Sequence, residues 1–476
     1  MLKAKAKSAV FWSMVSSFGS IIIQIVYGII MARLLTPYDF GLIAMAMVVI
    51  TISRSLVDSG FYQAVIQKKE VNRDELSAVF KFNLILALLL STSIFLFSNK
   101  LAQFFGERNL SEIFSLLALT IILEAFSLIQ RAILIKEIKF KLISKIEIFS
   151  LLVSSVLAIL LALNDFGVYS LVYKALVQVL LTTLCYWVFH PLKVNLLASF
   201  NYLKVFLNFG SKVFVADQIE VISNQITYGI IGKRFNSSDL GFFTKASQYQ
   251  SLISQTAIVS INKVVFPTLS KIQDDDVKLK SSYRILIKLS SFFIFPIMFI
   301  AIINGKEFVS LLLGDQWEQS IPYFKILCIG GLFYPFTVFN LNIIKVKGLG
   351  TMYLKVCLIT KGALLPMVLI GLNFGIVGIS IAIITHQIFA ATVNSSFSGK
   401  LIDYSLRMQI KDVFPSFISA IIALVAGLQV YSYLDEMLSP YTIVIKTLLF
   451  VLIYLSSLYI IAKKEIVMMY KTIVEK

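Results

Sequence analysis

Apolar segments of about 20 residues recur along the whole chain, and this pattern restricts the fold more than any other feature. Hydrophobic residues make up 58% of the 476 residues and charged residues only 14%, against about 25% charged in a typical soluble domain. The segments lack the alternation of barrel strands, so each predicts a transmembrane helix. About fourteen spans are expected, near residues 8–32, 41–66, 82–98, 112–131, 147–163, 168–189, 212–232, 241–265, 285–303, 322–344, 352–370, 376–396, 413–431 and 441–462.

Basic residues lie mostly in alternate loops between these spans. When the loops are numbered from the N-terminal arm, one side of the membrane holds thirty of these residues and the other side holds six. The positive-inside rule therefore predicts that both termini are cytoplasmic. The same distribution accounts for the net charge of +17, which suits contact with anionic membrane lipid and argues against a nucleic-acid partner.

One helix–hinge–helix unit occurs twice, about 200 residues apart. Residues 27–41 contain Tyr-Gly-Ile-Ile, an arginine six positions after the tyrosine, and Asp-x-Gly; residues 228–241 repeat these features with one residue fewer. A second match relates 164–170 to 373–380, at turns that enter the sixth and twelfth spans. Because six is even, the two halves keep the same orientation and are related by an axis along the membrane normal. The sequence thus predicts an all-α membrane protein with two six-helix lobes, at 1–200 and 201–400, and two additional helices with a cytoplasmic tail at 401–476.

Each hinge carries an arginine at the end of one helix and an aspartate at the start of the next. Arg33 and Asp39 belong to the first hinge, and Arg234 and Asp239 belong to the second. We expect each aspartate to cap the N-terminus of its helix and to pair with the arginine, because a carboxylate is favourable there. This interpretation makes the four residues a structural hinge, and contact of the arginines with a substrate is the alternative.

Several segments resemble one family of exporters. Residues 32–42 (ARLLTPYDFGL) resemble the Ala-Arg-x-Leu-x-Pro-x-Asp-Phe-Gly signature of the Wzx-type polysaccharide and O-antigen flippases, which belong to the multidrug/oligosaccharidyl-lipid/polysaccharide (MOP) exporter superfamily. Residues 239–246 (DLGFFTKA) and 266–274 (FPTLSKIQD) are similar to further segments of that family, and so are LGDQW at 313–317 and the Lys-Gly pair at 347–348. The resemblance covers at least residues 8–400, and Asn224 departs from it where an acidic residue is expected.

The resemblance implies two lobes that flank a central cavity, which opens alternately to the two sides of the bacterial cytoplasmic (inner) membrane. The cargo would be an oligosaccharide on a polyprenyl (pyro)phosphate carrier, flipped to the outer leaflet for the synthesis of lipopolysaccharide or another surface polysaccharide. Glycosyltransferases and a polymerase of the same pathway would be partners.

Charged residues inside the spans are the candidate functional residues, because each costs about 2.5–3.5 kcal/mol to insert and so faces a cavity or a partner. Cations from both lobes are expected to hold the (pyro)phosphate of the cargo. We assign this role to Arg54 and Lys174 in the first lobe and to Lys245 and Lys361 in the second. The alternative for Arg54 is an internal ion pair with Asp58, four residues later on the same helix.

Acidic residues in the spans are candidates for ion coupling. Asp217 and Glu220 share one face of the seventh span, and such a pair can bind Na⁺ or share a proton. Glu124, in the middle of the fourth span, is a rival site. The alternative is that the acids of the seventh span are internal counter-ions for Lys245 or Lys212.

The sequence contains no motif of an enzyme. It lacks a P-loop and a Gly-x-Ser-x-Gly motif, its two histidines and three cysteines form no metal-ligand cluster, and its outer loops are too short to hold a catalytic centre. We therefore expect a transporter without enzymatic activity, cofactor or metal site, in which Na⁺ or H⁺ is the coupling ion. Two alternatives stay open, namely an ion-coupled drug or small-metabolite antiporter of the same superfamily and a membrane glycosyltransferase or polymerase.

Overall fold

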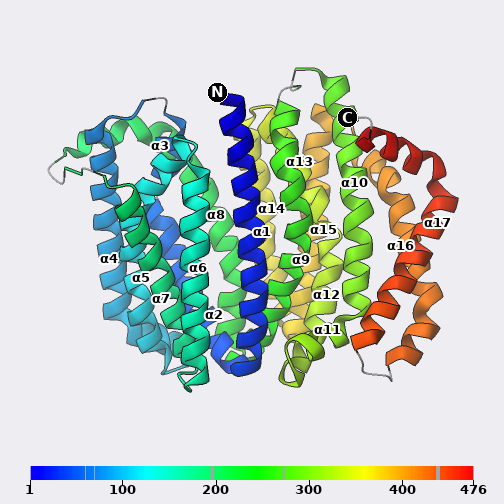
Figure 1. The fold of residues 1–476 in the computed structure, drawn as a ribbon, viewed down its shortest axis with the longest axis horizontal. Coiled ribbons are helices and arrows are strands. Elements are labelled where there is room, and N and C mark those ends of the chain that lie inside the picture. The colour runs from blue at the N-terminus through cyan, green and yellow to red at the C-terminus, as the bar shows by residue number, and fades with distance from the viewer. Residues whose placement is uncertain are drawn as a thin grey trace. The chain divides into compact units, whose positions relative to one another are not determined.

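The computed structural model describes residues 2–474, apart from positions 59, 69, 193, 196, 197, 271, 273 and 436–439. Within that part of the chain every element is a helix, which confirms the predicted all-α class (Figure 1). Internal contacts divide the chain into two compact units, residues 1–244 and 245–476, and the boundary lies inside α9 (Ser237–Ser270). The lobe boundaries expected from the repeat stay predictions.

The first unit contains the helices drawn from blue to green in Figure 1. Helix α4 packs on α5, α6 packs on both α1 and α7, and α2 packs on both α5 and α8. In chain order these elements are α1 (Leu2–Leu34), α2 (Pro37–Asp58), α3 (Phe61–Gln67), α4 (Arg73–Phe105), α5 (Leu110–Lys136), α6 (Phe140–Leu163), α7 (Val168–Phe189), the short 3₁₀-helix η1 (Phe200–Leu203) and α8 (Lys204–Arg234).

The second unit begins within α9. Its helices pack in sequential pairs, α14 on α15 and α16 on α17, while α12 and α13 both pack on α15. In chain order its further elements are α10 (Asp276–Ile303), α11 (Gly305–Leu312), the 3₁₀-helix η2 (Asp315–Ser320), α12 (Ile321–Gly331), α13 (Tyr334–Val346), α14 (Gly350–Leu372), α15 (Gly375–Leu401), α16 (Leu406–Asp435) and α17 (Pro440–Val474).

Eleven helices of the described chain are long and apolar enough to cross a membrane. The number is twelve if the bent pair of segments Asp315–Gly331 and Tyr334–Val346, which contain α12 and α13, forms one span. Helices α2 and α3 count as a single span, Pro37–Gln67. Large apolar side chains remain on the outside of these helices; Leu96, Val188 and Ile460, for example, are 70%, 72% and 80% exposed. Lipid tails cover such surface in a bilayer. The prediction of a multi-pass helical membrane protein is confirmed.

The first hinge folds as a capping box at the start of α2. Thr36 is the N-cap, and its backbone N–H and hydroxyl donate to Asp39 Oδ2 at 3.0 and 2.7 Å. Pro37 occupies the first helical position, where no backbone donor is needed. In the second hinge, Asn236 Oδ1 accepts a hydrogen bond from the backbone N–H of Asp239 at 2.7 Å. Each aspartate therefore stands at the third helical position, and the cap is the residue three positions earlier rather than the aspartate that we expected.

The two hinges pack against each other, backbone to backbone. A β-carbon built on Gly41 would lie 1.7 Å from the carbonyl oxygen of Ser237, and one built on Gly241 would lie 1.9 Å from the carbonyl oxygen of Pro37. Only glycine at both positions lets the starts of α2 and α9 approach this closely. The repeat predicted two related hinges but did not predict this reciprocal contact.

Glu107, in the turn between α4 and α5, ties the same two helix starts together. Its carboxylate accepts hydrogen bonds from Tyr38 Oη at 2.9 Å and from Ser237 Oγ. Lys233, at the end of α8, donates to the backbone carbonyl of Phe104 and lies 4.6 Å from the centroid of that ring. The contact between the hinges is thus held by the hydrogen bonds of Glu107 as well as by the glycine crossing, and Lys233 fastens the second hinge to α4.

Candidate functional site

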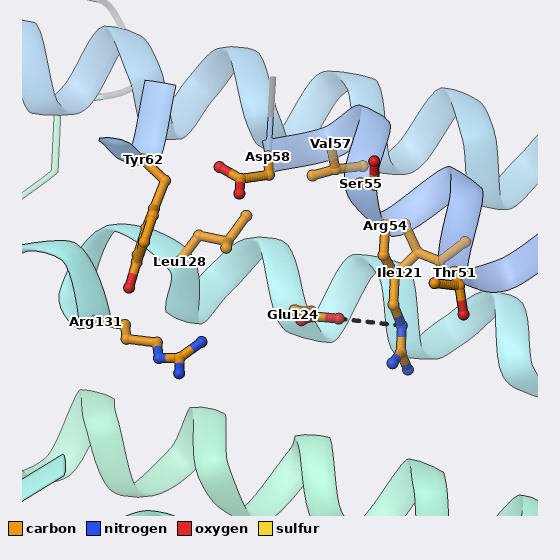
Figure 2. Close-up of a pocket in the computed structure, with 10 residues that line it drawn as sticks. All are labelled: Thr51, Arg54, Ser55, Val57, Asp58, Tyr62, Ile121, Glu124, Leu128 and Arg131. Carbon is orange, nitrogen blue, oxygen red and sulfur yellow. Dashed lines mark ion pairs between the residues drawn. The ribbon is translucent and has the colours of Figure 1, made fainter. Parts of the chain in front are cut away.

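A charged cavity of about 290 Å³ lies within the first unit, between the C-terminal half of α2, the start of α3 and the middle of α5. Figure 2 shows its lining, with Arg54 and Thr51 at one end, Tyr62 and Arg131 at the other, and Asp58 between them. The other lining residues are Ser55, Val57, Ile121, Glu124 and Leu128. Four charged side chains, those of Arg54, Asp58, Glu124 and Arg131, line one cavity between membrane-spanning helices and mark it as the candidate site.

Arg54 is held by a carboxylate from the neighbouring helix. Its Nε lies 3.1 Å from Glu124 Oε2, and the two side chains are 23% and 37% exposed. Arg54 Nη2 is buried and has no hydrogen-bond partner among the described residues. The packing of α2 on α5 therefore gives Arg54 a counter-ion and leaves part of its donor fork unused. The ion pair with Asp58, which was the alternative for Arg54, does not form; Arg54 pairs with Glu124 instead, and Asp58 lines the same cavity.

Arg131 forms the second cationic end of the cavity. Its Nη2 lies 3.1 Å from Glu147 Oε1 on α6, and Glu147 Oε2 accepts a hydrogen bond from Ser16 Oγ of α1 at 3.3 Å. Arg131 is the last residue of the predicted span 112–131, and α5 continues beyond it to Lys136. The sequence does contain a signal that Arg131 belongs to the site, because Arg131 follows Glu124 by two helical turns and so lies on the same helix face.

The predicted coupling acids lie in an adjoining cavity of about 250 Å³, which shares Ser55 and Asp58 with the first. Asp217 and Glu220 of α8 line it. Asp217 Oδ2 accepts a hydrogen bond from Gln63 Nε2 at 3.0 Å. The structure thus brings Asp217 and Glu220 next to Asp58, a partner that the sequence did not suggest. The described residues contain no group of three or more His, Cys, Asp or Glu side chains that could hold a metal ion.

Lys174 lies on α7 and is absent from the lining of both cavities. Its Nζ is 4.9 Å from the ring centroid of Tyr27, and it donates a hydrogen bond to Gln178 Oε1 at 3.1 Å. Its predicted contact with the cargo stays a prediction.

The two cations predicted for the second lobe belong to the second unit. Lys245 is only 2% exposed, and its Nζ lies 5.8 and 5.9 Å from the ring centroids of Tyr249 and Trp317. Cation–π contacts of this kind stabilise a desolvated ammonium. Lys361 is half-buried on α14, beside Thr360, whose carbonyl lies 3.0 Å from His386 Nε2 on α15. The aromatic surroundings of Lys245 were not predicted from the sequence, and the role of Lys245 in cargo binding stays a prediction.

The comparison with protein families decides the identity. A family model described as "Polysaccharide biosynthesis protein" matches residues 30–322, more than half of the chain. The chain belongs to this family. The resemblance to Wzx-type polysaccharide exporters is thereby confirmed.

Several relatives carry names from surface-polysaccharide synthesis or from its gene regions. An uncharacterised membrane protein of the cps region of Klebsiella pneumoniae is 28% identical over 69% of this chain and 69% of its own length. The lipopolysaccharide biosynthesis protein WzxC of Escherichia coli K12 is 24% identical over 70% of this chain and 68% of its own. The succinoglycan biosynthesis transport protein ExoT of Rhizobium meliloti is 23% identical over 71% of this chain and 68% of its own. WzxC is named as a biosynthesis protein and ExoT as a transport protein.

Solved structures share the fold. The lipid II flippase MurJ, in an inward closed conformation, matches with a TM-score of 0.79 at 16% identity, over 96% of this chain and 100% of its own. An inward-facing MATE-family multidrug transporter of the MOP superfamily matches with a TM-score of 0.64 at 16% identity, over 83% of this chain and 98% of its own. This member of the polysaccharide biosynthesis protein family therefore has a MurJ- and MATE-like fold. It is a multi-pass protein of the bacterial inner membrane.

Proposed function

We propose that this exporter is a flippase that moves a polyprenyl-(pyro)phosphate-linked oligosaccharide from the cytoplasmic to the outer leaflet. The observation that carries the proposal is the cavity between α2 and α5, which has an arginine at each end. A (pyro)phosphate carries the charge and the oxygens that two guanidinium forks bind best. The names of WzxC, ExoT and MurJ support the same transport role.

The carboxylates beside the arginines stabilise the two guanidinium groups in the membrane when no cargo is bound. Glu124 and Glu147 each hold one arginine through a single ion-pair contact, so neither guanidinium is buried as an isolated charge. When a phosphate enters the cavity, each arginine exchanges its carboxylate partner for a phosphate oxygen. Because one anion replaces another, both binding and release are feasible. Lys174, Lys245 and Lys361 remain proposed further contacts for the cargo.

The topology that fits this function has fourteen spans. Helices α8 and α9, with 31 and 34 residues, correspond to the predicted seventh and eighth spans and bring the twelve apolar spans to fourteen. We infer two six-helix lobes, 1–200 and 201–400, followed by two helices and a cytoplasmic tail in 401–476, with both termini in the cytoplasm. The cargo would cross by alternating access of the two lobes, and no enzymatic step is needed.

The contact between the hinges supports an alternating-access cycle. In the proposed topology it lies on the outer side of the membrane, where it would close the path to the outside. Arg33, Asp39, Arg234 and Asp239 belong to these hinges, and the caps formed by Thr36 and Asn236 set the starts of α2 and α9. We assign the four residues a structural rather than a cargo-binding role.

The coupling ion, Na⁺ or H⁺, would act at the acids of the adjoining cavity. Asp58, Asp217 and Glu220 share that cavity, whereas Glu124 serves as the counter-ion of Arg54. This favours the acids of α8 over Glu124 as the coupling site.

The test replaces each arginine of the cavity by glutamine, singly and together. Each variant is expressed in a host that depends on this exporter for its surface polysaccharide, beside Arg108→Gln, a control for an exposed arginine in the turn between α4 and α5. Loss of one charge-assisted hydrogen bond weakens cargo binding roughly ten- to a hundredfold. We therefore expect Arg54→Gln/Arg131→Gln to strand lipid-linked oligosaccharide on the cytoplasmic leaflet. Normal surface polysaccharide in the double variant would contradict the proposal.

A further inference from the structure

The tenth predicted span is broken in the middle. Helices α12 and α13 meet at a bend of 41° in the pair that spans Asp315–Val346. Gly330 and Gly331 end α12, and Pro335 stands in the first turn of α13. Interrupted helices in transporters free backbone groups and space inside the protein, and binding sites are commonly built at such breaks.

A cavity of about 80 Å³ opens at this break, inside the second unit. Its polar lining comes from Gln250, Ser251 and Ser254 of α9, Tyr334 of α13 and Gln387 of α15. A buried water needs about 10–15 Å³ of such space, so the cavity has room for several waters or for one edge of a sugar ring. None of the described residues that line it is charged.

The absence of charge in this lining decides which ligand chemistry fits. A phosphate would need cations, and a metal ion would need carboxylates, and the lining offers neither. Glutamine amides both donate and accept, as hydroxyl groups do, and a tyrosine offers an apolar ring with a polar tip. Amides, hydroxyls and one aromatic ring suit a neutral ligand with several hydroxyl groups.

Close packing holds Gln250 in place. Its Nε2 donates to Ser254 Oγ at 2.6 Å, one helical turn along α9. A β-carbon built on Gly331 would lie 2.9 Å from Gln250 Nε2 and 2.6 Å from Met298 Sδ. The glycine at the helix break therefore makes room for this amide at the wall of the cavity.

We propose that this cavity is a subsite for a sugar of the cargo, with Gln250 and Gln387 as its specificity-determining residues. The inference rests on the proposed function, because it takes the glycan of a lipid-linked oligosaccharide as the ligand. A site built to bond hydroxyl groups discriminates against ligands that lack them, because its buried polar groups would then lose their partners.

The test measures binding of three defined lipids to the full-length protein in nanodiscs. The probes are undecaprenyl diphosphate, which has no sugar, undecaprenyl-diphospho-N-acetylglucosamine and undecaprenyl-diphospho-galactose. Gln250→Met/Gln387→Met keeps the side-chain volume and removes the amides. Gln248→Met is the matched control, because Gln248 lies on the same helix as Gln250, is exposed and is absent from the cavity lining.

We expect the wild type to bind at least one glycosylated lipid about tenfold more tightly than the sugar-free lipid, which corresponds to about two neutral hydrogen bonds. The double methionine variant should bind all three lipids equally, with the affinity of the wild type for the sugar-free lipid. The proposal is overturned if the wild type shows no preference for a glycosylated lipid, or if the double variant keeps that preference. Failure of the wild type to bind any of the three lipids would instead reject the proposed function itself.

Discussion

Replacement of the hinge glycines by alanine tests whether the crossing of α2 and α9 is a latch of the transport cycle. Alanine is a better helix former than glycine by about 1 kcal/mol, so propensity alone predicts that Gly41→Ala and Gly241→Ala stabilise their helices. The structure predicts the opposite for the contact between the hinges. The added methyl group on either helix meets the backbone carbonyl of the other, which has no side-chain freedom with which to move away.

The required displacement follows from the geometry. The β-carbon of Gly41→Ala would start 1.7 Å from the carbonyl oxygen of Ser237 and has to reach at least 3.0 Å, so the hinges must separate by about 1.3 Å. Overpacking of this kind costs about 1–3 kcal/mol. A cost of that size lowers the population of the packed hinge roughly five- to 150-fold relative to an open one. The double variant Gly41→Ala/Gly241→Ala should lower the population of the packed hinge more than either single variant does.

Cysteine labelling reports the opening directly. Ser237 is 1% exposed, so Ser237→Cys should react slowly with a membrane-impermeant maleimide while the hinges are packed. In a background without the three native cysteines, Gly41→Ala should speed this reaction and slow export of the polysaccharide. Gly362→Ala is the control, because a β-carbon there meets no atom within 4 Å. Unchanged labelling and unchanged export in Gly41→Ala would refute the latch.

Two further predictions concern buried polar contacts of the second unit. The carboxylate of Glu307 is 2% exposed and pairs with Lys446, so Lys446→Met leaves it buried without its cation. We expect a loss of about 3–5 kcal/mol in stability, seen as a lower melting temperature in detergent. The double variant Lys446→Met/Glu307→Leu should recover the melting temperature, because no charge is then left buried. Asn340→Ala removes the side chain that donates to Ser395 Oγ at 2.9 Å and to Gln409 Oε1 at 3.0 Å; each polar group left unsatisfied costs about 1–3 kcal/mol, so the melting temperature should fall, and an unchanged value would contradict the importance of this network.

The fold could be predicted largely from the sequence because the membrane imposes one rule on every span. Backbone groups in lipid have to bond within the helix, so an apolar run of sufficient length becomes a helix with little regard to its neighbours. The sixth predicted span, 168–189, coincides with α7 (Val168–Phe189). The break between α12 and α13 was not predicted, since the run 322–344 is mostly apolar and long enough for one span, although it contains a Gly-Gly pair and a proline.

The candidate site could be predicted only in part, because it depends on which helices pack together. Arg54 was identified from its charge alone, but spacing along one helix suggested Asp58 as its partner. The packing of α2 on α5 brings Glu124 to it instead. Lys245 was likewise identified as an intramembrane cation, whereas its aromatic neighbour Trp317 lies too far along the chain for any local pattern to connect them.

Charged residues in a membrane-spanning segment are easier to identify from sequence as functional candidates than neutral polar residues are. This difference explains why the charged cavity was predicted in part and the neutral cavity was not. A charged residue in a span is rare and costly, so each one points to a cavity or a partner. Serine and glutamine occur in spans for ordinary packing between helices, so Gln250 and Gln387 carry no such signal. Only the convergence of α9, α13 and α15 on one uncharged cavity distinguishes them. The phosphate end of a cargo is therefore predictable from sequence, whereas the part of the protein that selects the sugar has to be found in the structure.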